Sequence, residues 1–304
     1  MDFKGSHIIS ISDFSKKDIL KVLRTAKKIE ENPRKCLIGK RMATLFFEPS
    51  TRTRLSFESA MLKLGGSILG FAKGSVSSQE KGESVRDTIR MIEQYADVAV
   101  IRHFLDGAPR AAGDVSKIPI INGGDGGNQH PTQALLDLYS ILKTQKTLQK
   151  LKVAFVGDLK YGRTVHSLAN GLSLFDAELI FVAPQDLHLP KSIREELDKK
   201  NIQCSIEEKI TDVIGKVNIL YMTRIQKERF PDLNEYERVK DVFILKKSML
   251  KYAKDNMKIM HPLPRVNEIS TDVDSTKYAY YFEQAGNGIP VRGALLCLVL
   301  GVEI

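Results

Sequence analysis

"MATLFFEPSTRTRLSFESA", residues 42–60, is the stretch of sequence that decides the fold. An apolar run at 42–47 has the composition of a buried strand, and a helical pattern follows at 52–64. The short turn between them, "STRTR", contains hydroxyls and arginines. Because hydroxyl and guanidinium groups donate hydrogen bonds, the turn indicates an anion site beside a strand of a parallel sheet.

The same alternation of strand and helix continues along the chain. Further strand-like runs lie at 97–101, 118–121, 152–156, 178–183, 218–222 and 257–260, and further helical patterns lie at 16–31, 84–95, 131–143, 163–174 and 191–200. Near-continuous apolar strands between amphipathic helices are typical of parallel sheets that are covered on both faces. The sequence therefore predicts an α/β protein with two doubly wound parallel-sheet domains.

The polar segment "KTQKTLQK" at 143–150 is the best candidate for a domain boundary, because it separates a long helix from the strand in "LKVAFVG". We expect one domain at 1–147 and a second at 148–285. The remaining segment, 286–304, contains the apolar run "IPVRGALLCLVLGV" with a proline near its start. This run predicts a C-terminal helix that is long enough to pack back on either half. We expect it to pack back on the first domain.

Composition narrows the class of protein. The 304 residues carry a formal net charge of +9, but the lysine pairs are dispersed and lack interleaved aromatic residues, which argues against nucleic acid binding. Three widely spaced cysteines indicate neither a disulfide framework nor a zinc site. The N-terminus lacks the pattern of an export signal, and no apolar stretch is long enough to span a membrane. We therefore expect a soluble cytoplasmic protein.

Donor-rich segments follow six of the predicted strands. They are "EPSTRTR" at 48–54, Arg102-His103, "NGGDGGNQHPTQ" at 122–133, "GDLKYGRT" at 157–164, "TRIQ" at 223–226 and "HPLPR" at 261–265. Open parallel sheets bind ligands beyond the carboxyl ends of their strands, so we expect these segments to meet in an active site in the interdomain cleft. Such a set of donors stabilises anions and a developing oxyanion.

Some of these segments also have simpler explanations. The helix start near Arg52 suits a phosphate, but a serine-capped helix with surface arginines fits it equally well. Lys81 lies in the loop "GSVSSQEKGES" at 74–84 and is able to reach an anion across a cleft or a subunit boundary, although a capping loop is the default explanation. His130 and Gln133 suit a carbonyl and an amide, yet a single histidine is most often structural.

Several enzyme classes lack their motifs in this sequence. It contains no GxxxxGK[ST], no HExxH, no acidic cluster and no Ser-His-Asp order. The turn in "VAFVGDLKYGRTVHSL" also lacks the glycine pattern of a dinucleotide site, and it carries Lys160 and Arg163 instead. We expect neither a metal nor an organic cofactor. Arg163, and further on Arg224 with Gln226, offer groups suited to carboxylates.

Nearly the whole chain resembles the catalytic chains of the aspartate carbamoyltransferase family. The segments that carry the resemblance are "FFEPSTRTRLSFESA", "KGES", "RH", "NQHPTQALLDLY", "GDLKYGRTVHSL", "MTRIQ", "HPLPR" and "QAGNGIPVRGALL". The resemblance implies that the amine of L-aspartate attacks carbamoyl phosphate, giving N-carbamoyl-L-aspartate and phosphate in de novo pyrimidine biosynthesis. It also implies that the first domain binds carbamoyl phosphate and the second binds aspartate.

The resemblance implies roles for individual residues. The expected catalytic residues are Arg52, Thr53, Arg102 and His130. The expected carbamoyl phosphate ligands are Ser50, Thr51, Arg52, Thr53, Ser77, Lys81, Arg102, His130, Gln133 and the carbonyl of Pro262. The expected aspartate ligands are Lys81, Arg163, Arg224, Gln226 and the carbonyl of Leu263. In the family, Ser77 and Lys81 come from a neighbouring protomer, which implies a homotrimer with shared active sites. Many members of the family bind separate regulatory chains, so the resemblance allows such partners, but no segment of this sequence indicates them.

Three other functions remain as alternatives. A periplasmic-type binding protein would also place arginines at an interdomain cleft, but it needs the export signal that the N-terminus lacks. An ornithine carbamoyltransferase should offer acids to the side-chain ammonium of its substrate, whereas Arg224 and Gln226 offer donors. A dehydrogenase would need the missing glycine motif.

Overall fold

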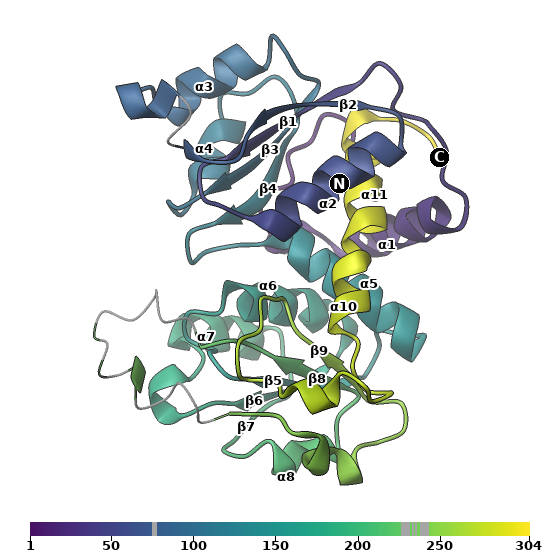
Figure 1. Cartoon of the computed structure of the whole chain (residues 1–304), viewed down its shortest axis with the longest axis vertical. Helices are drawn as coiled ribbons and strands as arrows, with labels where there is room; N and C mark the ends of the chain where they lie inside the picture. The colour runs from purple at the N-terminus through teal and green to yellow at the C-terminus, as the bar shows by residue number, and fades with distance from the viewer. Residues whose placement is uncertain (75–77, 226–231, 233, 235, 238–242) are drawn as a thin grey trace. The chain divides into compact units, whose positions relative to one another are not determined.

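The computed structural model describes residues 1–74, 78–225, 232, 234, 236–237 and 243–304 (Figure 1). They form two compact units, and each unit has its own parallel sheet. The first unit comprises Met1–Leu136 with Gly286–Ile304, and the second comprises Asp137–Ala285. The chain passes from the first unit to the second within helix α5 (Pro131–Gln145).

A four-stranded parallel sheet forms the centre of the first unit. Its strands are β1 (Arg41–Phe46), β2 (Ser67–Phe71), β3 (Val98–His103) and β4 (Ile120–Asp125), in the order β2-β1-β3-β4. The chain adds β2 on one side of β1 and then β3 on the other. The carboxyl ends of β1 and β3 therefore flank a topological switch point, which is where open α/β sheets bind ligands.

Helices cover both faces of this sheet. Figure 1 shows α3 (Val85–Ile92) and α4 (Ala108–Gly113) on one side, with α1 (Lys16–Glu31), α2 (Thr51–Lys63) and α11 (Gly288–Leu300) together on the other. Successive strand residues point to opposite faces, so both faces must be apolar. On the side of α3 and α4, the buried core includes Ala43, Leu45, Ala99, Ile101, Ile89 and Ala112.

Local capping explains where two of these helices begin or end. Before α1, the Ser15 hydroxyl accepts a hydrogen bond from the Asp18 N–H at 3.2 Å, and the Asp18 carboxylate accepts one from the Ser15 N–H at 2.9 Å. This reciprocal pair satisfies two donors at the helix start. Helix α11 ends at Leu300 and is followed by Gly301 as its C-cap, whose φ of +67° is the left-handed conformation in which glycine is favoured.

The second unit contains a five-stranded parallel sheet with a switch point of its own. Its strands are β5 (Lys152–Val156), β6 (Glu178–Val182), β7 (Cys204–Glu207), β8 (Ile219–Met222) and β9 (Lys258–Met260), in the order β7-β6-β5-β8-β9. Figure 1 shows α6 (Arg163–Leu172) and α7 (Lys191–Lys199) on one side, and α8 (Thr211–Ile214) on the other. The switch point lies between β5 and β8. A short helix, α10 (Tyr281–Gly286), precedes α11.

The predicted fold class, α/β with two parallel-sheet domains, is confirmed. The strands β2 and β7 were not predicted, because they are edge strands whose residues are exposed or half-buried, so no continuous apolar run marks them. Gly70 in β2 has a φ of +140°, and a Cβ there would lie 2.1 Å from the Thr44 carbonyl oxygen. Glycine is therefore required where β2 runs beside β1. None of the helices in the described residues has the length and hydropathy needed to cross a membrane.

Candidate functional site

The turn after β1 places the first turn of α2 at the switch point of the first sheet. Ser50 is the N-cap residue, but its side chain makes no capping hydrogen bond with the described residues. Thr51 and Arg52 are exposed, whereas Thr53 is buried. Although the Arg52 side chain is exposed, nearby protein partly desolvates its guanidinium and lowers its pKa, which still leaves the group cationic at neutral pH. The turn therefore combines hydroxyls, helix N–H groups and a positive charge, as an anion site requires.

Thr53 and His130 come together in the interior of the first unit. The Thr53 Oγ1 lies 3.4 Å from the His130 Nε2, and both side chains are buried. The carbonyl of His130 accepts hydrogen bonds from the N–H groups of Gln133 at 3.0 Å and Ala134 at 3.2 Å, so His130 starts helix α5. Gln133 is also buried, in the first turn of that helix. The Thr53 hydroxyl and the His130 imidazole thus lie close to the carboxyl edge of the sheet, and Gln133 follows within one turn of helix.

Arg102, on β3, has its guanidinium fixed by residues that follow or belong to other strands. Its Nη2 lies 2.9 Å from Glu48 Oε2, and its Nη1 donates to the Gly123 carbonyl at 3.1 Å. The Phe47 N–H donates to the Arg102 carbonyl at 2.9 Å. Glu48 was not predicted as a site residue, because only the donors of "EPSTRTR" point to an anion site. The available signal was an acid placed between a strand and an arginine-rich turn.

The loop between β2 and α3 is described only in part. Lys81 ends a short 3₁₀ helix (Ser78–Lys81) and is exposed. Lys81 takes no part in the contact between Thr53 and His130, or in the contacts of Arg102 with Glu48 and Gly123. Ser77, also predicted as a ligand, lies outside the described residues.

Two arginines predicted to bind aspartate lie at the switch point of the second sheet. Arg163 is the first residue of α6, after the turn that follows β5, and Arg224 comes two residues after the end of β8. Both side chains are half-buried. Because β5 and β8 are neighbouring parallel strands, the two arginine-bearing segments leave the same edge of the sheet. Gln226, the third predicted residue of this group, lies outside the described residues.

Thr223 ties these two strand ends together. Its N–H donates to the Val156 carbonyl at 2.8 Å, and its hydroxyl accepts from the Asp158 N–H at 3.0 Å. The Asp158 carboxylate, which is buried, in turn accepts from the Tyr161 N–H at 2.9 Å. These bonds hold the turn before Arg163 against the end of β8. The positions of Arg163 and Arg224 are therefore set by hydrogen bonds of Thr223 and Asp158 rather than by the arginine side chains alone.

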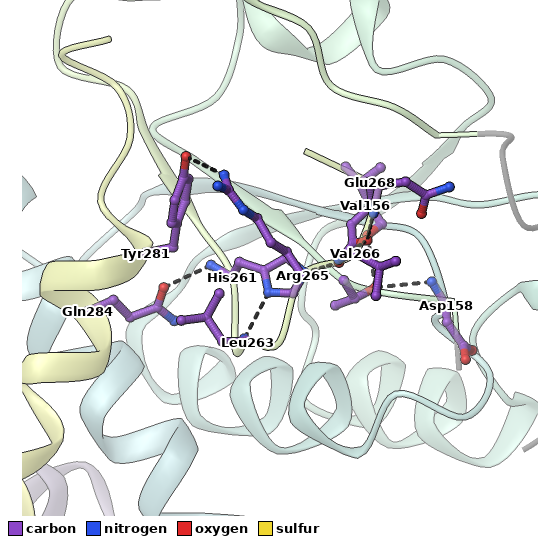
Figure 2. Close-up of polar contacts among 11 residues, drawn as sticks. Val156, Asp158, His261, Leu263, Arg265, Val266, Glu268, Tyr281 and Gln284 are labelled. Carbon is purple, nitrogen blue, oxygen red and sulfur yellow. Dashed lines mark hydrogen bonds and ion pairs between the residues drawn. The ribbon is translucent and has the colours of Figure 1, made fainter. Parts of the chain in front are cut away.

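The segment "HPLPR" follows β9 and is organised by His261, which is buried, whereas Pro262 and Leu263 are half-buried. Figure 2 shows the His261 ring turned back toward Leu263, whose N–H donates to His261 Nδ1 at 2.8 Å. Leu263 has a φ of +51°, a left-handed conformation that a leucine rarely adopts. Such a residue persists only where its surroundings fix it, and strained backbone of this kind clusters at functional sites.

Within the residues that the structure describes, no three His, Cys, Asp or Glu side chains are grouped so that they could hold a metal ion. The groups that the structure gathers at the sheet edges are hydroxyls, guanidinium groups, an imidazole and an amide. This donor set suits oxyanions and carboxylates, since each of these groups stabilises negative charge through hydrogen bonds.

Two family models match most of the chain. The model for "Aspartate/ornithine carbamoyltransferase, carbamoyl-P binding domain" matches residues 6–143. The model for "Aspartate/ornithine carbamoyltransferase, Asp/Orn binding domain" matches residues 149–299.

Curated relatives and solved structures agree with these matches. The aspartate carbamoyltransferase catalytic subunits of Parabacteroides distasonis and Thermococcus kodakarensis are each 54% identical to this chain, with 99% of both chains covered in each comparison. The catalytic subunit of M. jannaschii aspartate transcarbamoylase is 52% identical, with a TM-score of 0.89 and 96% of both chains covered. Aspartate transcarbamoylase from Trypanosoma cruzi, in complex with carbamoyl phosphate and aspartate, is 38% identical, with a TM-score of 0.92 and 98% of both chains covered. The predicted resemblance is thus confirmed, and the chain belongs to the aspartate/ornithine carbamoyltransferase family, among the aspartate carbamoyltransferase catalytic subunits.

Proposed function

We propose that the chain transfers the carbamoyl group of carbamoyl phosphate to the amine of L-aspartate. The products are N-carbamoyl-L-aspartate and phosphate, and the reaction serves de novo pyrimidine biosynthesis. The observation that best supports this proposal is the buried Thr53–His130 pair in the same unit as the guanidinium that Glu48 holds. A carbonyl bonded to a leaving phosphate needs donors for the developing oxyanion and cations for the phosphate.

The first unit takes carbamoyl phosphate. The phosphate is bound by the first turn of α2, and Arg102 contacts both the phosphate and the carbonyl oxygen. Thr53 and His130 polarise that carbonyl, while Gln133 binds the carbamoyl amino group. Glu48 supports this role of Arg102, because a side chain that is already oriented loses less rotamer entropy when it binds its ligand. The phosphate ligands in that turn are Ser50, Thr51, Arg52 and Thr53.

The second unit takes aspartate. Arg163 binds the α-carboxylate, and Arg224 binds the side-chain carboxylate together with Gln226. Each guanidinium offers a planar fork that matches a carboxylate. The carbonyl of Pro262 accepts a hydrogen bond from the carbamoyl amino group, and the carbonyl of Leu263 accepts one from the attacking amine. Their positions after β9, next to the buried His261, support these roles.

The reaction needs no covalent intermediate with the protein. The aspartate amine attacks in its neutral form, and the departing phosphate accepts the proton that the amine loses. The protein then contributes by holding two reactants in line and by stabilising charge, and these two effects account for large rate enhancements in other enzymes.

A homotrimer is the assembly that we propose for the active enzyme, in the cytoplasm. In it, Ser77 and Lys81 of one protomer complete the site of the next, and the exposure of Lys81 supports this arrangement. Separate regulatory chains are further candidate partners.

Ornithine carbamoylation is the second candidate, because the matching family models cover aspartate and ornithine enzymes together. Arg224 favours aspartate, since a guanidinium repels the ammonium group of ornithine and attracts a second carboxylate. The test incubates the purified chain with carbamoyl phosphate and either amino acid, and measures the ureido product by colorimetry. We expect the ureido product in the incubation with aspartate and none in the incubation with ornithine. Product only in the incubation with ornithine, or no product in either incubation, would overturn the proposal.

A further inference from the structure

A chain of buried polar side chains runs through the second unit and ends at the loop after β9. The Tyr221 hydroxyl donates to Asp137 Oδ2 at 2.8 Å, and the Gln284 Nε2 donates to Asp137 Oδ1 at 2.6 Å. The Gln284 Oε1 then accepts the main-chain N–H of His261 at 2.8 Å (Figure 2). All four side chains are fully buried or nearly so. The chain of contacts ends one residue before Pro262.

The contacts of the His261 ring define where its proton lies. The main-chain N–H of Leu263 donates to Nδ1, so Nδ1 is an acceptor and carries no proton. The Nε2 lies 2.7 Å from Glu268 Oε1, and a proton on Nε2 completes that bond. Burial lowers the pKa of His261, and this effect outweighs the opposing influence of Glu268. The ring is therefore neutral, in the Nε2–H tautomer.

Glu268 makes hydrogen bonds with both ends of the loop that follows β9. Its Oε2 accepts the N–H groups of Val266 at 3.0 Å and Asn267 at 3.1 Å, while its Oε1 meets the His261 ring. Figure 2 shows Glu268 and Val266 close together, beyond Arg265 along the loop. Burial raises the pKa of Glu268, but the hydrogen bonds with His261 and the main chain bring it below its ordinary value. An ionised carboxylate thus anchors both the ring and the end of the loop.

The second bond of the ring reaches the main chain of the loop. Both nitrogens of a buried, neutral imidazole need partners, and Nδ1 has its partner in the Leu263 N–H. Leu263 is also the residue with the left-handed φ of +51°. A peptide plane is rigid, so fixing the Leu263 N–H also fixes the direction of the Pro262 carbonyl in the same plane. The Leu263 conformation then sets its own carbonyl.

We propose that His261 is a positioning residue for carbamoyl transfer: its Nδ1 aims the carbonyls of Pro262 and Leu263 at the carbamoyl amino group and the attacking amine, while Glu268 and Gln284 hold the ring and main chain of His261 in place. This inference rests on the proposed function. The amine gains positive charge as it attacks, so a carbonyl acceptor aimed at its N–H stabilises the transition state more than the bound substrate. Misalignment should therefore lower kcat more than it raises KM.

Two amide variants separate the two bonds of the ring. In His261→Asn, the side-chain oxygen reaches the level of Nδ1 and still accepts the Leu263 N–H. In His261→Gln, the amide reaches the level of Nε2 and still donates to Glu268, but the Leu263 N–H loses its acceptor. We expect His261→Gln to lower kcat about 100-fold, as a misplacement of about 1 Å does, and His261→Asn to lower it about 10-fold or less. The KM for aspartate should change less than about threefold in both variants.

Asp274→Asn is the matched control, because it loosens the same loop without touching His261. Asp274 Oδ2 accepts from Arg265 Nη2 at 2.6 Å, and this pair is partly exposed. Its loss should leave kcat within about twofold of wild type. Equal losses of kcat in the two His261 variants, or a loss of kcat in Asp274→Asn as large as in His261→Gln, would overturn the proposal. So would a loss that appears mainly in KM.

Two further measurements test whether His261 acts as a base and which of its ring nitrogens carries the proton. The pH profile of kcat in His261→Asn should keep the shape of the wild-type profile, whereas the loss of one limb would make His261 a base and not a positioning residue. If neither variant folds, ¹⁵N NMR of histidine-labelled wild type at about pH 8 decides: the proposal requires the neutral Nε2–H tautomer of His261, and the Nδ1–H tautomer overturns it. Wild type that is inactive with aspartate overturns the proposed function itself, which this tautomer measurement does not address.

Discussion

Lowering the pH should destabilise the wild-type protein more than the His261→Asn variant. In the folded chain, burial lowers the pKa of His261, and the charges of Arg265 and Arg224 lower it further. Unfolding returns the ring to its ordinary pKa of 6.5. The unfolded chain then binds a proton that the folded chain does not. His261 therefore contributes stability above pH 6.5 and loses that contribution as the pH falls toward its lowered folded value.

The size of the effect follows from this one proton. Well below pH 6.5, a proton bound only by the unfolded chain changes the free energy of unfolding by about 1.4 kcal/mol per pH unit. From about pH 7.5 to about pH 5, a ring that stays neutral in the folded chain accounts for at most about 2 kcal/mol. Glu268 loses its contribution only at more acidic pH, because its folded pKa lies below 4.5. The lowered pKa values of His7, His103 and His166 affect both proteins equally.

Urea unfolding followed by circular dichroism, at one protein concentration and at the two pH values, measures this difference. We expect the gap in unfolding free energy between wild type and His261→Asn to narrow by up to about 2 kcal/mol at the lower pH. Asp274→Asn should keep the wild-type dependence on pH in this range, because it leaves the histidine in place. If wild type and His261→Asn lose the same stability, then His261 binds its proton equally in both states, and the reasoning is wrong.

Three further outcomes are expected. Arg224→Ala should raise the KM for aspartate at least about 100-fold while the affinity for carbamoyl phosphate changes little, because one carboxylate loses its guanidinium partner. Steady-state kinetics measures the first quantity and calorimetry the second, and an equal loss for both substrates would contradict the assignment. Mixing Lys81→Ala and Arg52→Ala proteins under conditions of proven subunit exchange should restore some activity through sites with both residues intact, and no recovery would indicate a site contained in one chain. The Cys36 and Cys297 sulfurs lie 3.5 Å apart, so a thiol oxidant such as diamide should join them, as peptide mass mapping would detect. Burial raises the pKa of Cys297, so disulfide formation should accelerate as the pH rises and more of the thiol ionises. Free thiols at Cys36 and Cys297 after prolonged oxidation at high pH would refute the expected pairing.

Local patterns were enough to predict most of the larger elements. The helix predicted at 16–31 is α1, and the strand predicted at 152–156 is β5. Both follow from signals within the segment itself, namely apolar periodicity for the helix and a continuous apolar run for the strand. The strand β2 gave no such signal, because an edge strand has one side exposed. Gly70 is required there by the close approach of the Thr44 carbonyl on the neighbouring strand, which the sequence of β2 does not reveal. The short helices α4 and α8 were missed because they have too few residues to show a period.

The candidate site divides in the same way. The arginine turns were found from sequence, because parallel strands place their carboxyl ends at one edge of a sheet. Glu48 was not found, since its part in the site depends on Arg102, whose strand β3 pairs with β1 only in the folded sheet. The contacts of His261 were not found either, because the direction of its ring depends on the left-handed conformation of Leu263.

The sequence by itself determined the alternation of strands and helices, the order of the donor-rich segments and, through both, the family to which the chain belongs. Only the tertiary structure decided which side chains meet. Gln284 and Asp137 are 147 residues apart in the chain and form one buried hydrogen bond. Such a pair has no local signature, because it depends on strand order, helix placement and backbone dihedral angles that are fixed together when the second unit folds.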